Sequence, residues 1–224
     1  MLNILHYEPI NFTFLTMKNK FSSYQTSVIH GLMLGDGHIA INKNIGDDTF
    51  KYTQTFGQFA EPFANCVYDI FREYCSDKGL YTYKVQSGKD SPLYQRWIVR
   101  TKTHDVFDEF DTMYYIYNKL GKRIKIVPLN IEDYLTPVAL AFLVMSDGSF
   151  HKQKHIVKIY TNSFTKAEVQ LLSNAIFNNF GIQLSVTRAT KEEYTLIVRK
   201  SILTKFQQIV KAYMIPSLLY RIGL

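Results

Sequence analysis

Two stretches of the sequence carry apolar residues at helical spacing, and each stretch leads to an Asp-Gly pair. The first covers 26–34 and leads to Asp36, and the second covers 136–145 and leads to Asp147. Residues three or four positions apart share one face of a helix, so both stretches predict apolar helices. The second stretch begins with a Thr-Pro pair, which supplies a threonine N-cap and a proline in the first turn.

Each of these helices is followed by sequence typical of strands and further helices. The predicted strands alternate apolar and polar positions or are rich in β-branched and aromatic residues, and they cover 49–56, 80–86, 94–101, 155–161, 182–188 and 194–200. The further predicted helices cover 61–76, 103–117, 166–180 and 201–213. Gly79 and Gly181 follow one helix in each half, where a left-handed C-cap residue is expected.

The chain also repeats itself. Four segments of the first half match segments of the second half in the same order: 31–37 with 142–148, 78–81 with 180–183, 97–100 with 196–199 and 126–129 with 214–217. The separation shrinks along the chain, from 111 residues between the aspartates (147 − 36) to 88 between the prolines (216 − 128). Chance similarity is the alternative, but four matches in order favour a duplicated domain whose second copy has shorter loops.

The repeat and the predicted elements together indicate an α+β fold of two pseudo-symmetric αββαββα repeats, each with a four-stranded antiparallel sheet. The predicted organisation begins with an N-terminal extension over 1–24 and a first repeat over 25–120. A linker over 121–135 and a second repeat over 136–224 complete it.

Composition narrows the class of protein. The 224 residues are 46% hydrophobic and 20% charged, which is typical of a globular chain and unlike a disordered one. Cys66 and Cys75 are too few for a disulfide framework or a four-cysteine zinc site, and their spacing on a predicted helix places them too far apart to pair. The longest apolar run, 135–145, is too short to cross a membrane, and the N-terminal residues lack the pattern of a signal or transit peptide.

The net charge of +7 favours a polyanionic partner without specifying one. An antiparallel sheet can leave one face open, and basic or amide side chains there can contact phosphates and base edges. An ordinary solvated surface is the alternative, and recurrence in both halves favours nucleic acid. The candidate DNA contacts are Lys43, Lys84, Gln86, Arg96, Arg100, Lys152, Lys154, Lys158, Arg188 and Arg199.

Asp36 and Asp147 occupy equivalent positions at the ends of the two apolar helices. Twofold packing of the repeats would bring these carboxylates together, and a divalent cation would relieve their repulsion. Gly31 and Gly35 permit a close approach of the helices. Oxygen ligands suit Mg²⁺, which can activate water against a phosphodiester. A simple turn after each helix is the alternative, which two pairs at matching positions disfavour.

The residues that lead to the two Asp-Gly pairs, IHGLMLGDG over 29–37 and LAFLVMSDG over 140–148, resemble the motif of the LAGLIDADG homing endonucleases. The resemblance covers nearly the whole chain and is to the intron-encoded, single-chain form with two repeats. It implies that the motif helices form the interface between the halves. It also implies that the two sheets form a saddle over a long, nearly asymmetric DNA site, whose strands are cut across the minor groove to leave 3′ overhangs.

The same resemblance implies a set of site residues. The implied metal ligands are Asp36 and Asp147, with the carbonyl groups of Gly35 and Ser146 nearby. They would hold two or more Mg²⁺ ions, for which Mn²⁺ could substitute. Lys125 and Arg221 would each lie near a scissile phosphate. Because arginine stays charged, the role of Arg221 would be electrostatic.

Phe142 departs from the family pattern, which has a small residue at the tight helix crossing, so the second helix must pack through other positions. Retention of both aspartates implies an active nuclease that promotes intron mobility. The alternatives are an RNA-binding intron maturase of the same fold and a nonenzymatic DNA-binding module. A monomer is expected, and a bias toward Phe, Tyr, Ile, Asn and Lys suits an AT-rich, mitochondrial genome.

Overall fold

Each half of the chain forms one four-stranded antiparallel sheet in the computed structural model, which describes residues 21–43, 48–86, 88 and 91–224. The sheet orders are β1-β2-β4-β3 and β7-β8-β10-β9, which are equivalent. The strands of the first sheet are β1 His38–Asn42, β2 Thr49–Phe56, β3 Tyr81–Gln86 and β4 Leu93–Arg100. Those of the second are β7 Gly148–His151, β8 Ile156–Tyr160, β9 Ser185–Arg188 and β10 Tyr194–Val198. Every predicted strand is therefore present.

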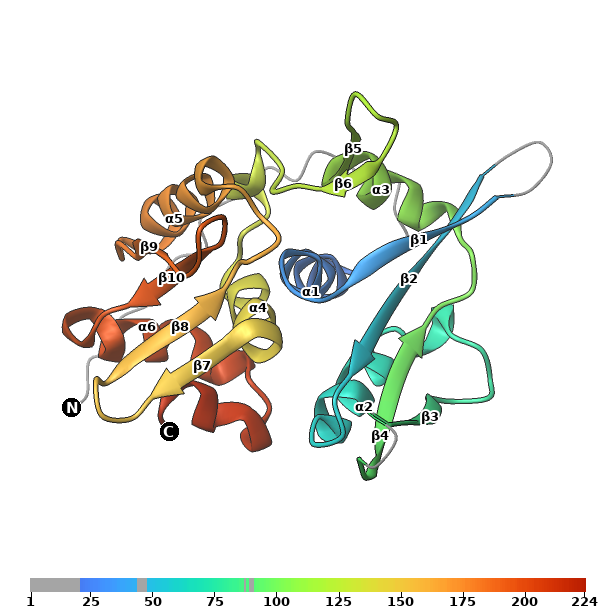
Figure 1. Ribbon diagram of the computed structural model, residues 1–224, viewed down its shortest axis with the longest axis horizontal. Coiled ribbons are helices and arrows are strands. Elements are labelled where there is room, and N and C mark those ends of the chain that lie inside the picture. The colour runs from blue at the N-terminus through green and yellow to red at the C-terminus, as the bar shows by residue number, and fades with distance from the viewer. Residues whose placement is uncertain (1–20, 44–47, 87, 89–90) are drawn as a thin grey trace, which may run out of the picture.

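The α-helices complete an αββαββα order in each half, as the repeat predicted. They are α1 Ser23–Leu34, α2 Glu61–Ile70, α3 Asp108–Tyr114, α4 Pro137–Asp147, α5 Lys166–Phe180 and α6 Leu203–Val210. Figure 1 shows α1 and α4 at the centre, with one sheet on each side of them. Most of the predicted N-terminal extension, 1–24, falls outside the described residues.

Side-chain caps start both central helices, at the predicted residue for α4 and three residues before the predicted start for α1. Thr136 accepts a hydrogen bond from the Ala139 backbone N–H at 3.1 Å at the start of α4. Ser22 and Gln25 form a capping box at the start of α1. A cap of this kind satisfies backbone donors that the first helical turn leaves unpaired.

The two central helices pack closely because α1 presents a glycine at their crossing. A Cβ atom on Gly31 would overlap the carbonyl oxygen of Ala139 and would lie 2.8 Å from Cβ of Phe142. Phe142 therefore lies at the crossing itself, opposite Gly31, which corrects the expectation that the second helix packs through other positions. The ring of Phe142 packs near Phe63 of α2, with 6.1 Å between the ring centroids.

A hairpin replaces the predicted end of the third helix. α3 ends at Tyr114, and β5 Tyr115–Tyr117 pairs with β6 Arg123–Lys125. Oδ1 of Asn118 closes the turn by accepting the backbone N–H groups of Leu120 and Lys122 at 3.0 and 2.9 Å. The hairpin lies across the predicted boundary at residue 120, and the domain boundaries stay a prediction.

The two glycines predicted as helix C-caps differ. Gly181 follows α5 directly and has a φ of 62°, as a left-handed C-cap requires. Gly79 also has a positive φ, 76°, but α2 has already ended at Ile70, and Gly79 lies in the turn before β3. The predicted C-cap at Gly79 is therefore wrong, because a short 3-10 turn over Arg72–Tyr74 replaces the end of the helix.

Cys66 and Cys75 are both free, as their spacing predicted. Within the described ranges, the structure contains no helix that is long and apolar enough to cross a membrane.

His30 lies in the middle of α1 and is buried in the first half. Its Nδ1 atom lies 2.9 Å from the hydroxyl of Tyr114, and its ring stacks on Tyr134 with 4.5 Å between centroids. Burial lowers the pKa of His30 to about 3. The folded protein therefore holds this histidine in its neutral form.

We expect His30 to make the fold sensitive to acid. An unfolded histidine, with a pKa of about 6.5, binds a proton at pH values where folded His30 stays neutral. The free energy of unfolding should therefore fall as the pH drops from about 6.5 toward 3, by about 2 kcal/mol at pH ~5. Urea unfolding of the wild type and His30→Gln at pH ~7.5 and ~5 measures the effect. The same pH dependence in both proteins would contradict it.

Candidate active site between the two motif helices

The C-terminal ends of α1 and α4 bring the two predicted carboxylates to one cavity. Asp36 lies just after α1, and Asp147 is the last residue of α4. A cavity of about 250 Å³ is lined by both aspartates and, from the second half, by Tyr160, Asn162 and Ser163. The structure thus joins the halves of the repeat at a shared acidic centre.

The two carboxylates have different surroundings. Burial raises the pKa of Asp147 to about 7, and the charge of Asp36 acts in the same direction. Oδ2 of Asp147 is buried and has no hydrogen-bond partner within the described chain. The side chain of Asp36 is exposed to solvent on one side. Protein atoms around the rest of it remove water from the carboxyl group and so raise its pKa. The buried, unpaired oxygen is the strongest indication of a bound cation, because such an oxygen is costly to leave without a partner.

A basic side chain is bound to the backbone on both sides of each aspartate. Nζ of Lys125 donates to the carbonyl oxygens of the residues before and after Asp36, each at 2.6 Å. One Nη of Arg221 donates to the equivalent carbonyls around Asp147, at 3.3 and 2.6 Å. Burial lowers the pKa of Lys125 to about 8, while both aspartates act in the opposite direction. Both predicted basic residues therefore lie at the acidic centre.

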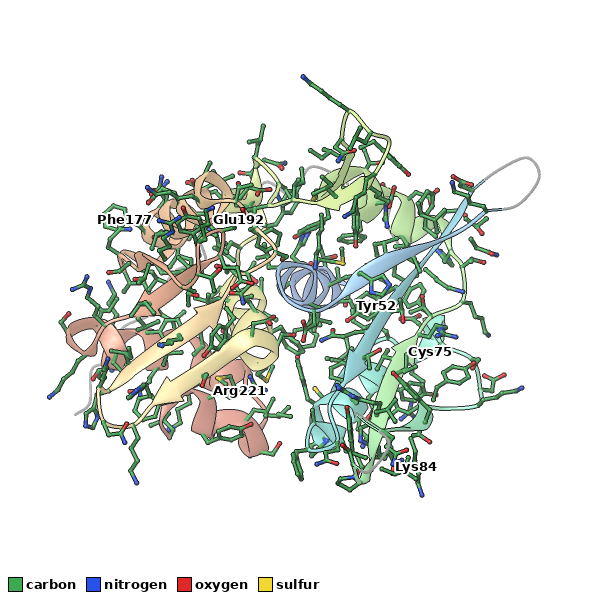
Figure 2. The ribbon with its side chains drawn as sticks, viewed as in Figure 1. Tyr52, Cys75, Lys84, Phe177, Glu192 and Arg221 are labelled. Carbon is green, nitrogen blue, oxygen red and sulfur yellow. The ribbon has the colours of Figure 1, made fainter. Side chains whose placement is uncertain are left out.

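Lys125 and Arg221 reach equivalent places from different elements. Lys125 ends β6 and precedes Pro128, whereas Arg221 lies in a 3-10 segment, Pro216–Ile222, that begins at the matching proline. Their equivalence is therefore spatial and does not follow from aligning the repeats. Figure 2 shows Arg221 near the C-terminal segment, below α4.

The carbonyl groups of Gly35 and Ser146, implied as neighbours of the metal, accept these hydrogen bonds from Lys125 and Arg221. A carbonyl oxygen has a second lone pair, so each could still face a cation. In the part of the chain that the structure describes, no three His, Cys, Asp or Glu side chains gather into a metal site. A cation at the two aspartates would therefore need further oxygen ligands from the backbone, water or a substrate phosphate.

Sequence reasoning missed a polar bridge beside the acidic centre. Gln54 of β2 is only 2% exposed, and it accepts a hydrogen bond from the hydroxyl of Tyr52. Its Nε2 donates to Oγ of Ser146 at 3.2 Å and so links the first sheet to α4. Figure 2 shows Tyr52 beside α1. A signal was present, because Gln54 interrupts the otherwise aromatic positions 50, 52 and 56 on one face of the predicted strand.

Strand pairing divides the predicted contacts of the first sheet between two faces. Paired residues share a face, and neighbours along a strand alternate. Arg96 pairs with Tyr83, which is the neighbour of Lys84 along β3. Lys84 and Gln86 therefore lie on the opposite face from Arg96 and Arg100, which corrects the expectation of one shared basic surface. Figure 2 shows Lys84 at the outer end of the sheet, away from α1 and α4.

Arg96 and Arg100 lie on the open face of the first sheet. The alternate residue Val99 is fully buried on the other face. The guanidinium groups of the two arginines lie over Tyr94 and Tyr81, at 5.2 and 5.6 Å from the ring centroids. The open face therefore combines positive charge with aromatic rings.

Lys158 and Arg199 lie on the open face of the second sheet. Lys158 pairs with Ile197, whose two neighbours along β10 are buried on the other face. Nε of Arg199 donates to Oγ of Ser185, which also pairs with Ile197. These two predictions thus agree with the face that the pairing leaves open.

The remaining predicted contacts lie at strand ends and turns. Lys152 and Lys154 are exposed between β7 and β8, and Lys43 is exposed after β1. Nε of Arg188 donates to the carbonyl oxygens of Thr190 and Lys191, each at 3.1 Å. Arg188 is thus engaged with its own turn, while the three lysines are accessible.

The two αββαββα repeats of this chain pack like the subunits of a dimer, and each repeat contributes one aspartate to the acidic centre between them. The fold is therefore that of a single-chain pseudo-dimer. The sequence profile of the LAGLIDADG DNA endonuclease family matches residues 26–206. The chain therefore belongs to this family.

Named relatives include both maturases and endonucleases. The cytochrome b mRNA maturase bI2 of Saccharomyces cerevisiae is 32% identical over 88% of this chain, which spans only 47% of that protein. The DNA endonuclease I-ChuI of Chlamydomonas applanata is 23% identical over 89% of this chain and 94% of that protein. The solved structure of the homing endonuclease I-WcaI bound to its DNA recognition sequence matches with a TM-score of 0.77 at 22% identity. That match covers 91% of this chain and 88% of I-WcaI, and it shows the two-repeat fold.

Proposed function

We propose that this protein is a site-specific, metal-dependent endonuclease that cuts both strands of a DNA duplex. The observation that carries the proposal is the meeting of Asp36 and Asp147 in one cavity, each beside a backbone-bound cationic side chain. Metal-assisted hydrolysis of a phosphodiester uses ligands for the metal and positive charge near the phosphate. Both requirements are present where two open sheet faces flank the same centre.

The donor set fits Mg²⁺, with Mn²⁺ as a substitute. Carboxylates are hard oxygen ligands, and one of the two has a buried oxygen with no hydrogen-bond partner in the described part of the chain. Mg²⁺ commonly binds one or two carboxylates together with substrate phosphate. Asp36 and Asp147 would hold the ions, two or more in number, with the carbonyl groups of Gly35 and Ser146 nearby. When bound, such an ion supplies an activated water and stabilises the leaving oxygen.

Lys125 and Arg221 would stabilise the charge that develops on the two scissile phosphates. Lys125, with a pKa lowered to about 8, can also exchange a proton near neutral pH. An arginine side chain carries its charge without acting as a proton shuttle, so the part of Arg221 would be electrostatic. The two halves of the site thus differ in chemistry although they match in geometry.

The open sheet faces would track a long, nearly asymmetric duplex. We expect Arg96→Ala to weaken DNA binding and to lower the slope of log Kd against log salt by about one, as loss of a phosphate contact does. Lys84→Ala on the opposite face is the matched control, for which a much smaller change is expected. Fluorescence anisotropy across a salt series measures both, and equal effects would contradict this assignment of faces.

The same proposal includes cleavage across the minor groove to leave 3′ overhangs, promotion of intron mobility, and action as a monomer. Relatives named as intron-encoded endonucleases and as an mRNA maturase support an intron origin. Expression from a mitochondrial genome is part of the proposal, supported by the residue bias of an AT-rich gene.

Intron maturase activity is the second candidate function. It is favoured by the 32% identity to the bI2 maturase over 88% of this chain. This activity requires RNA binding and does not require the acidic centre. If the Asp36→Asn variant supports splicing of the host intron at the wild-type rate, maturase activity is present and is separate from DNA cleavage.

The endonuclease proposal is tested by selecting cut molecules from a library of randomised duplexes with Mg²⁺, Mn²⁺, Ca²⁺ or EDTA. We expect Mg²⁺ and Mn²⁺ to yield one enriched site cut on both strands, and Ca²⁺ and EDTA to yield none. If no molecule is cut, and a duplex recovered by binding alone is bound tightly yet not nicked in Mg²⁺ or Mn²⁺, a nonenzymatic DNA-binding module remains.

A further inference from the structure

The β5–β6 hairpin is an insertion that carries Lys125. Arg100 and Pro128 are 28 positions apart, whereas their matches, Arg199 and Pro216, are 17 apart, a difference of 11 residues (28 − 17). The hairpin from the start of β5 to the end of β6 covers 11 residues, and the second repeat has no matching hairpin among its described residues. The first half therefore supplies its basic residue from an element that the second half lacks.

Two side chains of the hairpin fasten it to β1, the edge strand of the first sheet. The hydroxyl of Tyr115 accepts the backbone N–H of Ile39 at 3.1 Å. Arg123 donates to the carbonyl oxygen of the same residue at 2.8 Å. Both polar backbone groups of Ile39 are thus bound by the hairpin, where a further strand would otherwise pair.

Arg123 is itself held in place from two more sides. Its guanidinium lies 3.4 Å from the ring centroid of Tyr115 and forms an ion pair with Asp111 of α3. The side chains of the ion pair are 19% and 15% exposed, so solvent screens the pair only partly. We call Tyr115, Arg123 and Asp111, together with the Ile39 backbone, the hairpin clamp.

The clamp sets the position of Lys125 relative to Asp36. Tyr115 is the cross-strand partner of Lys125, and Arg123 lies two residues before it on the same face. Ile39 lies three residues after Asp36 in the chain. The clamp therefore joins the strand that carries Lys125 to the strand that begins beside Asp36. A flexible lysine would otherwise sample many rotamers, and misplacement by about 1 Å can slow a reaction by about 100-fold.

The second half holds Arg221 in another way. Arg221 belongs to the 3-10 segment Pro216–Ile222, which Gly223 follows directly. Gly223 packs on the ring of Phe150 in β7, the edge strand that corresponds to β1. Loss of the hairpin clamp should therefore leave the geometry around Asp147 unchanged. The anchoring of Lys125 can therefore be disturbed without moving Arg221, while both aspartates stay in place.

We propose that Arg123 and Tyr115 are positioning residues for the cut made beside Asp36 and Lys125, and that they have no part in the cut made beside Asp147 and Arg221. The inference rests on the proposed endonuclease function. It predicts that damage to the clamp converts a double-strand cutter into an enzyme that mainly nicks one strand.

The test measures the cleavage rate of each strand separately, on a selected duplex labelled differently on its two strands. Lys125→Met and Arg221→Met first identify which strand each half cuts. Arg123→Met should then slow the Lys125-dependent strand by about 10- to 100-fold and leave the other strand within about twofold. Tyr115→Phe, which removes only the hydroxyl, should slow the same strand by a smaller factor.

Arg72→Met is the matched control. Arg72 also pairs with an aspartate, Asp69, and lies over a tyrosine, Tyr68, but it sits on an exposed helix end. It should change neither rate. Equal slowing of both strands by Arg123→Met and Tyr115→Phe, or no slowing by either, overturns the positioning role while the nuclease stands. If the wild-type protein cuts neither strand, both the proposed endonuclease function and the positioning role of Arg123 and Tyr115 are wrong.

Discussion

Asp147→Asn is expected to abolish cleavage of both strands while the protein stays folded and bound to DNA. Asp147 shares its cavity with Asp36, so the ions that we propose these carboxylates hold would serve both halves of the site. Loss of a metal ligand should remove several kcal/mol of transition-state stabilisation, which lowers the rate by about 10³-fold or more. Asp36→Asn should behave in the same way. Single-turnover cleavage at saturating enzyme measures the rate, and gel shift in Ca²⁺ measures binding.

Thermal unfolding separates a lost metal site from a lost fold. The buried Oδ2 of Asp147 has no hydrogen-bond partner among the described residues and lies near a second carboxylate, so a neutral asparagine removes repulsion in the metal-free protein. The Tm of metal-free Asp147→Asn should therefore equal or exceed that of the wild type. Added Mg²⁺ should raise the Tm of the wild type more than that of the variant. Cleavage by the variant within about tenfold of the wild-type rate would refute the assigned role.

Gly31→Ala is expected to destabilise the protein strongly, although it adds only one methyl group. The added Cβ would overlap the Ala139 carbonyl oxygen, which is backbone of α4 and cannot rotate away. Alanine gains about 1 kcal/mol over glycine in a helix, but forcing two packed helices apart costs about 3 kcal/mol or more. The net loss of about 2 kcal/mol should lower the Tm by about 4–8 °C for a chain of this size.

Gly57→Ala provides the control, because the nearest atom to its added Cβ is 4.0 Å away. Its Tm should change by no more than about 1 °C. Differential scanning calorimetry compares the two variants with the wild type. A Gly31→Ala protein as stable as Gly57→Ala would show that the helix crossing is looser than described.

The sequence was sufficient for the repeat, because duplication keeps the order of elements even when loops change length. The helices around Leu32 and Val144 and the meeting of their aspartates follow from apolar spacing and from the matched Asp-Gly pairs. The hairpin was not predictable, because 115–117 continues an apolar pattern that also fits the end of a helix. Residues 115–117 form a strand because they pair with β6, and this contact between separate segments cannot be read from the local pattern.

The relative placement of the predicted DNA contacts depends on strand register, which the alternation of residues along each strand does not reveal. Alternation shows that Arg96 and Arg100 share a face, and that Lys84 and Gln86 do, but not how the two strands are aligned. The register supplies that information. In the same way, Arg221 reaches its place only because the C-terminal segment folds back toward α4, which no local pattern encodes.

The helix crossing also limits how such proteins can be recombined. Gly31 on α1 leaves the space that Phe142 on α4 fills. The two helices therefore fit each other, whereas two copies of the same helix would not fit. A homodimer of two second halves would place bulky residues against each other, and one of two first halves would leave the crossing underfilled. Chimeras with a half from another family member should therefore fold best when positions 31 and 142 are exchanged as a matched pair. We therefore expect each half to pair better with the other half than with a second copy of itself.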